Sequence, residues 1–194
     1  MRCSLNSITI INSDLENDLK IANETGFEGI EIWRQLFKPK LEDFLSKKSA
    51  NDLADLLSVY NLEPVSICPF LNMFFSSEDE RKKNIKTFKE MLYVGDIIGC
   101  SLLIVCPEEI HGVESDKIKN RALVILQLLG DLAEDYEIKV GFEFRGVESE
   151  FTPNLYSTNE LINELNHNSV GLVIDTPHFF KSKSSFEDLE SVNM

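Results

Sequence analysis

Short, strongly apolar segments recur along this chain at an interval that few folds accommodate. Each is rich in β-forming residues, and the stretches between them carry apolar residues at helical spacing. From the second strand on, the predicted strands recur about every 30 to 38 residues, which is the length of one strand–helix unit. Because nearly continuous apolar strands must be covered on both faces, this repeat predicts a parallel sheet flanked by helices. The predicted strands are Leu5–Ile11, Gly29–Trp33, Pro64–Cys68, Ser101–Cys106, Lys139–Phe144 and Gly171–Asp175.

The residues that border the helical stretches support this alternation. Glycine and asparagine tolerate the left-handed conformation that ends a helix, and one of them precedes several of the strands. These expected helix ends are Gly26, Asn61, Gly99 and Asn168. Polar residues that can cap a helix N-terminus stand before the first, third and fifth helices. The expected caps are Asn12 or Ser13, Ser76 or Ser77, and Ser157 or Thr158.

The chain length limits the architectures that can hold about six strand–helix units. A doubly wound open sheet and a (β/α)₈ barrel both accept the pattern. Eight units of about 33 residues need roughly 260 residues, and this chain has 194. We therefore expect either an open sheet or a barrel with about six of its eight units. The sequence contains neither a GxGxxG fingerprint nor a GxxxxGK[ST] loop, so no motif supports a dinucleotide-binding or P-loop protein.

Charge and composition argue against several classes of function. The formal net charge is -14 at pH 7, and such a surface repels phosphate backbones and anionic lipids. We therefore expect no nucleic-acid partner and no membrane association. No stretch of the sequence approaches the roughly 20 apolar residues that a membrane helix needs. The four cysteines form no CxxC pair, which predicts reduced thiols in a cytoplasmic protein.

Polar side chains at the ends of two consecutive strands are the strongest indication of chemistry. Glu143 lies inside an apolar strand, and Asp175 ends the next strand, with His178 three residues later. Ligands bind at the carboxyl ends of the strands in parallel βα sheets. Adjacent strands stand about 4.8 Å apart, so two carboxylates at matching heights would repel each other. A divalent cation between them resolves that repulsion, and His178 can act as a ligand, a proton donor or a substrate contact.

These three residues also have structural explanations that the sequence leaves open. Glu143 can be an ion-pair partner of Arg145 or of a lysine. Asp175 can cap the helix that follows its strand, although Pro177 and His178 make that arrangement less regular. His178 can be an ordinary surface histidine.

Other candidates are weaker. Trp33 ends a strand and can belong either to the core or to a pocket, and Arg145 can meet a substrate anion. We therefore expect His178, Trp33 and Arg145 to be the substrate-binding residues. His111 and His167 stand in loop or helix-end positions, where we expect solvated side chains.

Three segments together resemble a known family. They are Gly26-Phe-Glu-Gly-Ile-Glu-Ile32, Gly141-Phe-Glu143 and Gly171-Leu-Val-Ile-Asp-Thr-Pro-His178. In this order they resemble the xylose isomerase-like barrel superfamily of sugar-phosphate isomerases and epimerases, which also includes ketose 3-epimerases, inosose dehydratases and the endonuclease IV type of DNA-repair enzyme. The resemblance runs through essentially the whole chain. It implies one xylose isomerase-like TIM-barrel domain over residues 1–194, of the (β/α)₈ type but shortened to about six units.

The resemblance also implies a divalent-metal enzyme that uses Mn²⁺, Mg²⁺, Co²⁺ or Zn²⁺ and acts on a sugar or sugar phosphate. By position, Glu143 and Asp175 would be metal ligands, and His178 would touch the substrate or the metal. In such enzymes the metal polarises a substrate carbonyl, one glutamate removes a carbon-bound proton, and a second returns it through an enediolate. The expected catalytic residues are therefore Glu143, as one of these two groups, and His178.

The sequence departs from the family pattern in one respect. The family takes a further histidine and glutamate ligand from strands seven and eight, which this sequence does not contain. The chain can be a fragment of a longer protein, a naturally truncated member of the family, or a chain that another chain completes, and as given we expect weak or absent catalysis. An alternative is a non-catalytic barrel that serves as a binding or assembly module, because an open sheet exposes two edges that a homo-oligomer would cover. An endonuclease is a weaker alternative, because the strand ends that would carry histidines read Cys68-Pro-Phe70 and Cys106-Pro-Glu108.

Overall fold

The computed structural model describes residues 3–34, 38–110 and 115–192, and within them six strands form one sheet. All neighbouring strands are parallel, and their spatial order is the order of the chain. A doubly wound sheet reverses its strand order at a switch point, whereas a (β/α)₈ barrel adds each strand beside the previous one. The barrel type with six units is therefore confirmed. The strands are β1 (Ser4–Asn6), β2 (Gly29–Trp33), β3 (Glu63–Phe70), β4 (Leu102–Val105), β5 (Lys139–Glu143) and β6 (Val170–Val173).

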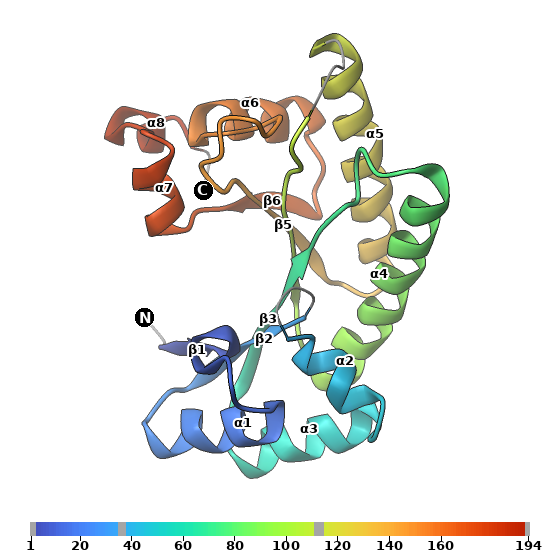
Figure 1. Ribbon diagram of the computed structural model, residues 1–194, viewed down its shortest axis with the longest axis vertical. Helices are drawn as coiled ribbons and strands as arrows, with labels where there is room; N and C mark the ends of the chain where they lie inside the picture. The colour runs from blue at the N-terminus through green and yellow to red at the C-terminus, as the bar shows by residue number, and fades with distance from the viewer. Residues whose placement is uncertain (1–2, 35–37, 111–114, 193–194) are drawn as a thin grey trace.

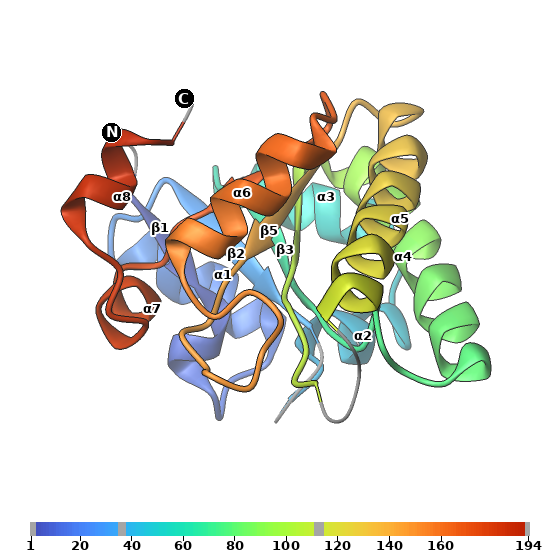
Figure 2. The same ribbon diagram turned by 90° about the horizontal axis from the view of Figure 1, so that it is seen from above.

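Helices cover the outer side of the curved sheet, and α4 and α5 lie side by side there in both views (Figures 1 and 2). The elements outside the sheet are η1 (Ser7–Ile10), α1 (Leu15–Glu24), α2 (Lys40–Leu45), α3 (Ala50–Val59), α4 (Glu78–Ile98), α5 (Ser115–Glu134), α6 (Leu155–Leu165), α7 (Thr176–Lys181) and α8 (Phe186–Glu190). None of the helices in the described part of the chain combines the length and apolar character needed to cross a membrane.

The sheet curves but does not close among the described residues. β1 pairs only with β2, and β6 pairs only with β5. In Figure 1 the ribbon forms an open arc, with the N-terminal strand on one side of the opening and α7 on the other. Side chains from β1, β2, β5 and α7 nevertheless line a single cavity. The curvature alone therefore brings distant strands to one site.

Alternation along β2 shows how the sheet separates core from cavity. Ile30 and Ile32 are fully buried in the main hydrophobic core, together with residues of the outer helices. Glu31 and Trp33 alternate with them and line the cavity on the other face. Because successive side chains of a strand point to opposite faces, the alternate residues of β2 face the cavity, where they can contact a ligand.

Several predicted boundaries are wrong at the ends of elements. The run Leu5–Ile11 is a strand only as far as Asn6, because the Asn6 side chain accepts a hydrogen bond from the Ile8 N–H and starts the 3₁₀ helix η1. Asp14 rather than Asn12 or Ser13 caps α1.

The predicted cap and end of α6 are wrong, whereas those of α4 are confirmed. Asn154 rather than Ser157 or Thr158 caps α6, and its left-handed end residue is Asn166 rather than Asn168. Ser77 does cap α4, and Gly99 ends that helix in the left-handed conformation, as predicted.

A buried ion pair fixes the segment that follows β1. The Lys40 ammonium donates hydrogen bonds to Asp18 Oδ2 at 2.6 Å, to the Ser7 carbonyl at 2.6 Å and to the Ile10 carbonyl at 2.8 Å. Both charged side chains are fully buried. Ser7 Oγ in turn accepts a hydrogen bond from the Trp33 N–H at 2.8 Å. The pair therefore connects α1 and α2 to the end of β2, where the cavity begins.

Candidate active site

The three residues singled out at the strand ends meet in one cavity. Glu143 is the last residue of β5, Asp175 follows β6, and His178 lies in the first turn of α7. The cavity has a volume of about 340 Å³ and lies at the carboxyl ends of the strands. A larger hollow of about 570 Å³ lies near the amino ends of β2 and β3, but no cluster of metal-ligating side chains among the described residues adjoins it. The smaller cavity is therefore the candidate site.

Glu143, Asp175 and His178 are close enough to act on one ligand. His178 Nδ1 lies 3.1 Å from Glu143 Oε1 and 3.4 Å from Asp175 Oδ1. One ligand atom from each residue falls within 4.8 Å of the others. The hydrogen bond with Glu143 raises the pKa of His178, against the opposing effect of burial. Because Nδ1 faces the carboxylates, it carries the ring proton of the neutral imidazole, and the lone pair remains on Nε2.

Asp175 has the structural role that the sequence left open, as well as a place in the cavity. It is the N-cap of α7, and its Oδ1 accepts a hydrogen bond from the His178 N–H at 2.8 Å. Pro177 does not disturb this arrangement, because the capped N–H belongs to the third residue of the helix and proline lacks a donor. The cap holds the carboxylate in place while its side chain remains 38% exposed to the cavity.

Glu143 is not the partner of Arg145. The Arg145 guanidinium instead pairs with the buried Glu150 carboxylate and donates a second hydrogen bond to the Pro107 carbonyl at 3.2 Å. Among the described residues, Glu143 forms no ion pair with an arginine or a lysine, and its polar neighbours are His178 and the Cys106 thiol. Burial raises the pKa of Cys106, and the Glu143 charge raises it further, so the thiol is protonated. Arg145 lines the cavity with its charge already balanced.

Trp33 lies beside the cavity, and so does Glu31, which was not among the candidate residues. Both residues belong to β2 and line the cavity. Burial raises the pKa of Glu31, and the charges of Glu143 and Asp175 add to that effect. Glu31 lies in the middle of its strand rather than at its end. Its alternation with Ile30 and Ile32 is the signal that would have found it.

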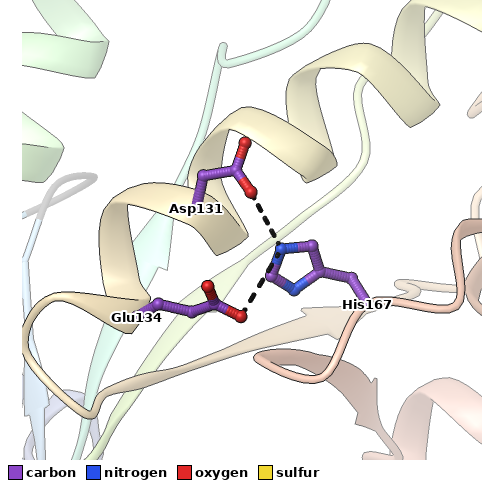
Figure 3. A group of neighbouring side chains, drawn as sticks. All are labelled: Asp131, Glu134 and His167. Carbon is purple, nitrogen blue, oxygen red and sulfur yellow. Dashed lines mark hydrogen bonds and ion pairs between the residues drawn. The ribbon is translucent and has the colours of Figure 1, made fainter.

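A second group of potential ligands does not have the chemistry of a metal site. Asp131 and Glu134 on α5 face His167, whose Nε2 lies 3.2 Å from Asp131 Oδ1 and 4.0 Å from Glu134 Oε1 (Figure 3). His167 Nδ1 accepts a hydrogen bond from the Ser169 N–H at 3.0 Å. The neutral ring must therefore carry its proton on Nε2, which donates to Asp131 and leaves that nitrogen no lone pair for a metal.

His167 therefore has a packing role, and the prediction that its side chain is solvated is wrong. Its side chain is only 6% exposed and lies against Gly130, where a Cβ atom would come within 2.6 Å of the imidazole ring. The ring joins α5 to the start of β6 because the helix offers no side chain at that position. His111, the other histidine expected to be solvated, lies outside the described residues.

The donor set in the cavity fits a divalent cation. The Glu143 and Asp175 carboxylates are ligands that Mn²⁺, Mg²⁺, Co²⁺ and Zn²⁺ accept to different degrees, and His178 Nε2 keeps a lone pair for a cation or a substrate hydroxyl. The capping bond on Asp175 and the hydrogen bond between Glu143 and His178 orient these ligands, as outer contacts do in metal sites.

Comparison with known proteins places the chain in a family. The family model described as xylose isomerase-like TIM barrel matches residues 19–192. The inosose isomerases of Bacillus velezensis (strain DSM 23117 / BGSC 10A6 / LMG 26770 / FZB42) and Bacillus subtilis (strain 168) are 27% and 29% identical over 195 residues, covering 98% of this chain and 68% of each relative. A crystal structure of IOLI protein with a binding zinc atom aligns with a TM-score of 0.91 and 27% identity, over 99% of this chain and 69% of that one. A D-tagatose 3-epimerase-like protein shares the fold, with a TM-score of 0.77 and 21% identity, over 99% of this chain and 72% of that one. The chain therefore belongs to the xylose isomerase-like TIM barrel family.

Proposed function

We propose that this protein is a divalent-metal-dependent isomerase or epimerase that acts on a neutral polyhydroxylated ketone of the inosose type. The convergence of Glu143, Asp175 and His178 in one cavity carries the proposal. The names of the inosose isomerase relatives and the zinc atom of the IOLI structure support it. The chain spans about two thirds of the length of those proteins. An activity like theirs is therefore a proposal for this chain.

Each residue has a distinct part in the proposed reaction. Glu143 and Asp175 would hold the cation, which supplies Lewis-acid polarisation of the substrate carbonyl. The Glu143 carboxylate is placed to accept the proton that leaves the carbon beside that carbonyl. His178 donates its Nδ1 proton to Glu143 at 3.1 Å, which fixes the ring and keeps the Nε2 lone pair as an acceptor for a substrate hydroxyl. Asp175 holds the first turn of α7, and with it the His178 ring.

The charges around the cavity favour a neutral substrate over a sugar phosphate. Three carboxyl groups line it, from Glu31, Glu143 and Asp175. Among the described lining residues, Arg145 is the one arginine or lysine, and Glu150 already neutralises it. Even with a divalent cation bound, three ionised carboxylates would leave the site negatively charged, and its described lining residues offer a phosphate dianion no unpaired guanidinium. Hydroxyl groups, in contrast, can donate hydrogen bonds to every carboxylate in the site.

A metal titration with two variants tests the proposal. Mn²⁺ binding is followed by electron paramagnetic resonance in wild type, Asp175→Ala and the control Asp131→Ala. We expect wild type and Asp131→Ala to bind one ion with similar affinity, and Asp175→Ala to bind at least tenfold more weakly, since an orienting or ligating group is lost. Identical, negligible binding in wild type and Asp175→Ala would remove the proposal.

Proton exchange provides the chemical readout. With inosose in D₂O and Mn²⁺ present, the proton on the carbon beside the carbonyl should be replaced by deuterium, and nuclear magnetic resonance follows its disappearance. We expect Glu143→Gln to lose this exchange, because an amide cannot accept the proton. Equal exchange rates in wild type and Glu143→Gln would show that Glu143 is not the base.

A second candidate function, a binding or assembly module, is favoured by the open sheet. The outer edges of β1 and β6 are unpaired within the described chain, and Phe180 and Phe186 are each 67% exposed beside β6. Unpaired edges and exposed aromatic rings favour association. Light scattering tests this alternative, which requires a dimer or larger species and is contradicted by a monomer.

A further inference from the structure

A polar row crosses the first three strands on the cavity side of the sheet. Asn6, Glu31 and Ser66 are paired in register on β1, β2 and β3. The Asn6 amide donates to Glu31 Oε1, and the Ser66 hydroxyl donates to Glu31 Oε2 at 2.5 Å. Both carboxyl oxygens are therefore fixed by neighbouring strands. Such a side chain is held in one orientation before any ligand arrives.

Glu31 has no cationic partner that would explain a structural role. Among the described residues, no lysine or arginine forms an ion pair with it. Burial raises the pKa of Glu31, and the charges of Glu143 and Asp175, which are of the same sign, raise it further. A buried carboxyl group without a cation is unfavourable for folding. Its presence in the middle of an apolar strand therefore suggests a role in binding.

The position of Glu31 fits such a role. It lines the same cavity as Glu143 and His178, but from β2 rather than from β5 and α7. Each carboxyl oxygen has two acceptor positions, and Asn6 and Ser66 occupy one on each. The second position of each oxygen remains for a donor that enters the cavity. A ligand with several hydroxyl groups can reach both walls at once.

We propose that Glu31 is a substrate-positioning residue whose carboxyl group hydrogen-bonds a hydroxyl of the neutral polyol, across the cavity from Glu143 and His178. This inference rests on the proposed function and adds a residue on a different strand. Asn6 and Ser66 then act through Glu31, since they fix the direction of its two oxygens. The preference for a polyol over a simple ketone follows, because a substrate without hydroxyls leaves the second acceptor position of each Glu31 oxygen unused.

Calorimetric titration of inosose into Mn²⁺-saturated protein tests the inference, with Glu31→Gln as the variant. Glutamine keeps the size of the side chain and removes its acid group. Glu28→Gln, an exposed carboxylate on the same segment but away from the cavity, is the matched control. We expect Glu31→Gln to raise the Kd for inosose by roughly 10- to 100-fold, as loss of a hydrogen bond to a charged group does. Its Mn²⁺ affinity should stay close to that of wild type, because Glu143 and Asp175 hold the ion, and its resistance to urea should equal or exceed that of wild type.

The outcomes separate this inference from the proposed function. Unchanged inosose affinity in Glu31→Gln, with Mn²⁺ still bound, overturns the role of Glu31 and leaves the metal site standing. Lower stability with unchanged affinity assigns Glu31 a structural role and overturns the inference. Absence of Mn²⁺-dependent inosose binding in wild type overturns the proposed function, and the inference with it. Weaker binding of inosose by Glu31→Gln, with unchanged Mn²⁺ affinity and with Glu28→Gln behaving as wild type, supports it.

Discussion

Replacement of Lys40 by methionine should destabilise the protein strongly. Methionine keeps the apolar stem but removes the ammonium, which makes three hydrogen bonds of 2.6 to 2.8 Å. The change leaves the fully buried Asp18 carboxylate and the Ser7 and Ile10 carbonyl groups without this donor. Breaking one side of a buried pair costs about 3 to 5 kcal/mol. That is a large part of the roughly 5 to 15 kcal/mol that stabilises a typical domain.

The assay is urea unfolding followed by circular dichroism, with the melting temperature as a second measure. For a chain of this size, 1 kcal/mol corresponds to about 2 to 4 °C, so the expected decrease is roughly 6 to 20 °C. Lys48→Met is a matched control, because Lys48 also pairs with an acidic residue of α1, Glu16, at 2.8 Å, but both side chains are more than 40% exposed. An exposed pair contributes about 0 to 1 kcal/mol.

The double variant Asp18→Asn/Lys40→Met should recover part of the loss, because no unpaired charge then remains in the interior. A loss below about 1 kcal/mol for Lys40→Met, equal to that of Lys48→Met, would refute the reasoning that this pair anchors the segment leading to Trp33.

Two further predictions concern the histidines. Gly130→Ala should destabilise the protein by about 1 to 3 kcal/mol in urea unfolding, because the new Cβ would lie 2.6 Å from the His167 ring and 2.7 Å from Val170 Cγ2. Gly171→Ala, where a Cβ would meet nothing within 4 Å, is the control, and equal effects would contradict the packing role of His167. The pKa of His178 is raised in the folded protein. In metal-free protein, the stabilisation that protonated His178 provides is therefore complete below the unfolded pKa of about 6.5. That stabilisation is lost as the pH rises through the higher folded pKa. The difference in unfolding free energy between wild type and His178→Gln should therefore shrink from pH 6 upwards, and a constant or growing difference would be inconsistent with the Glu143 hydrogen bond as the cause.

Much of the fold follows from local physical rules. Period-two and helical spacing, together with residues such as Gly99 that tolerate left-handed backbone, determine where strands and helices lie. The bounds predicted for β2 are those observed, and β5 differs by one residue. Caps were harder to place, because neighbouring polar residues compete and only the backbone direction selects one, as with Asp14 over Ser13. The short helices α2, α7 and α8 carry too few apolar repeats to be recognised.

The sequence by itself determined that Glu143 and Asp175 lie at the carboxyl ends of neighbouring strands, because strand order and strand ends follow from the repeat of one unit. Only the tertiary structure decided their partners. It gave Arg145 to Glu150 rather than to Glu143, and it brought Glu31 into the same cavity. The physical reason differs for the two: sheet curvature brings Glu31 to residues more than 100 positions later, and side-chain direction selects Glu150 over Glu143 for Arg145, so neither contact leaves a local pattern in the chain.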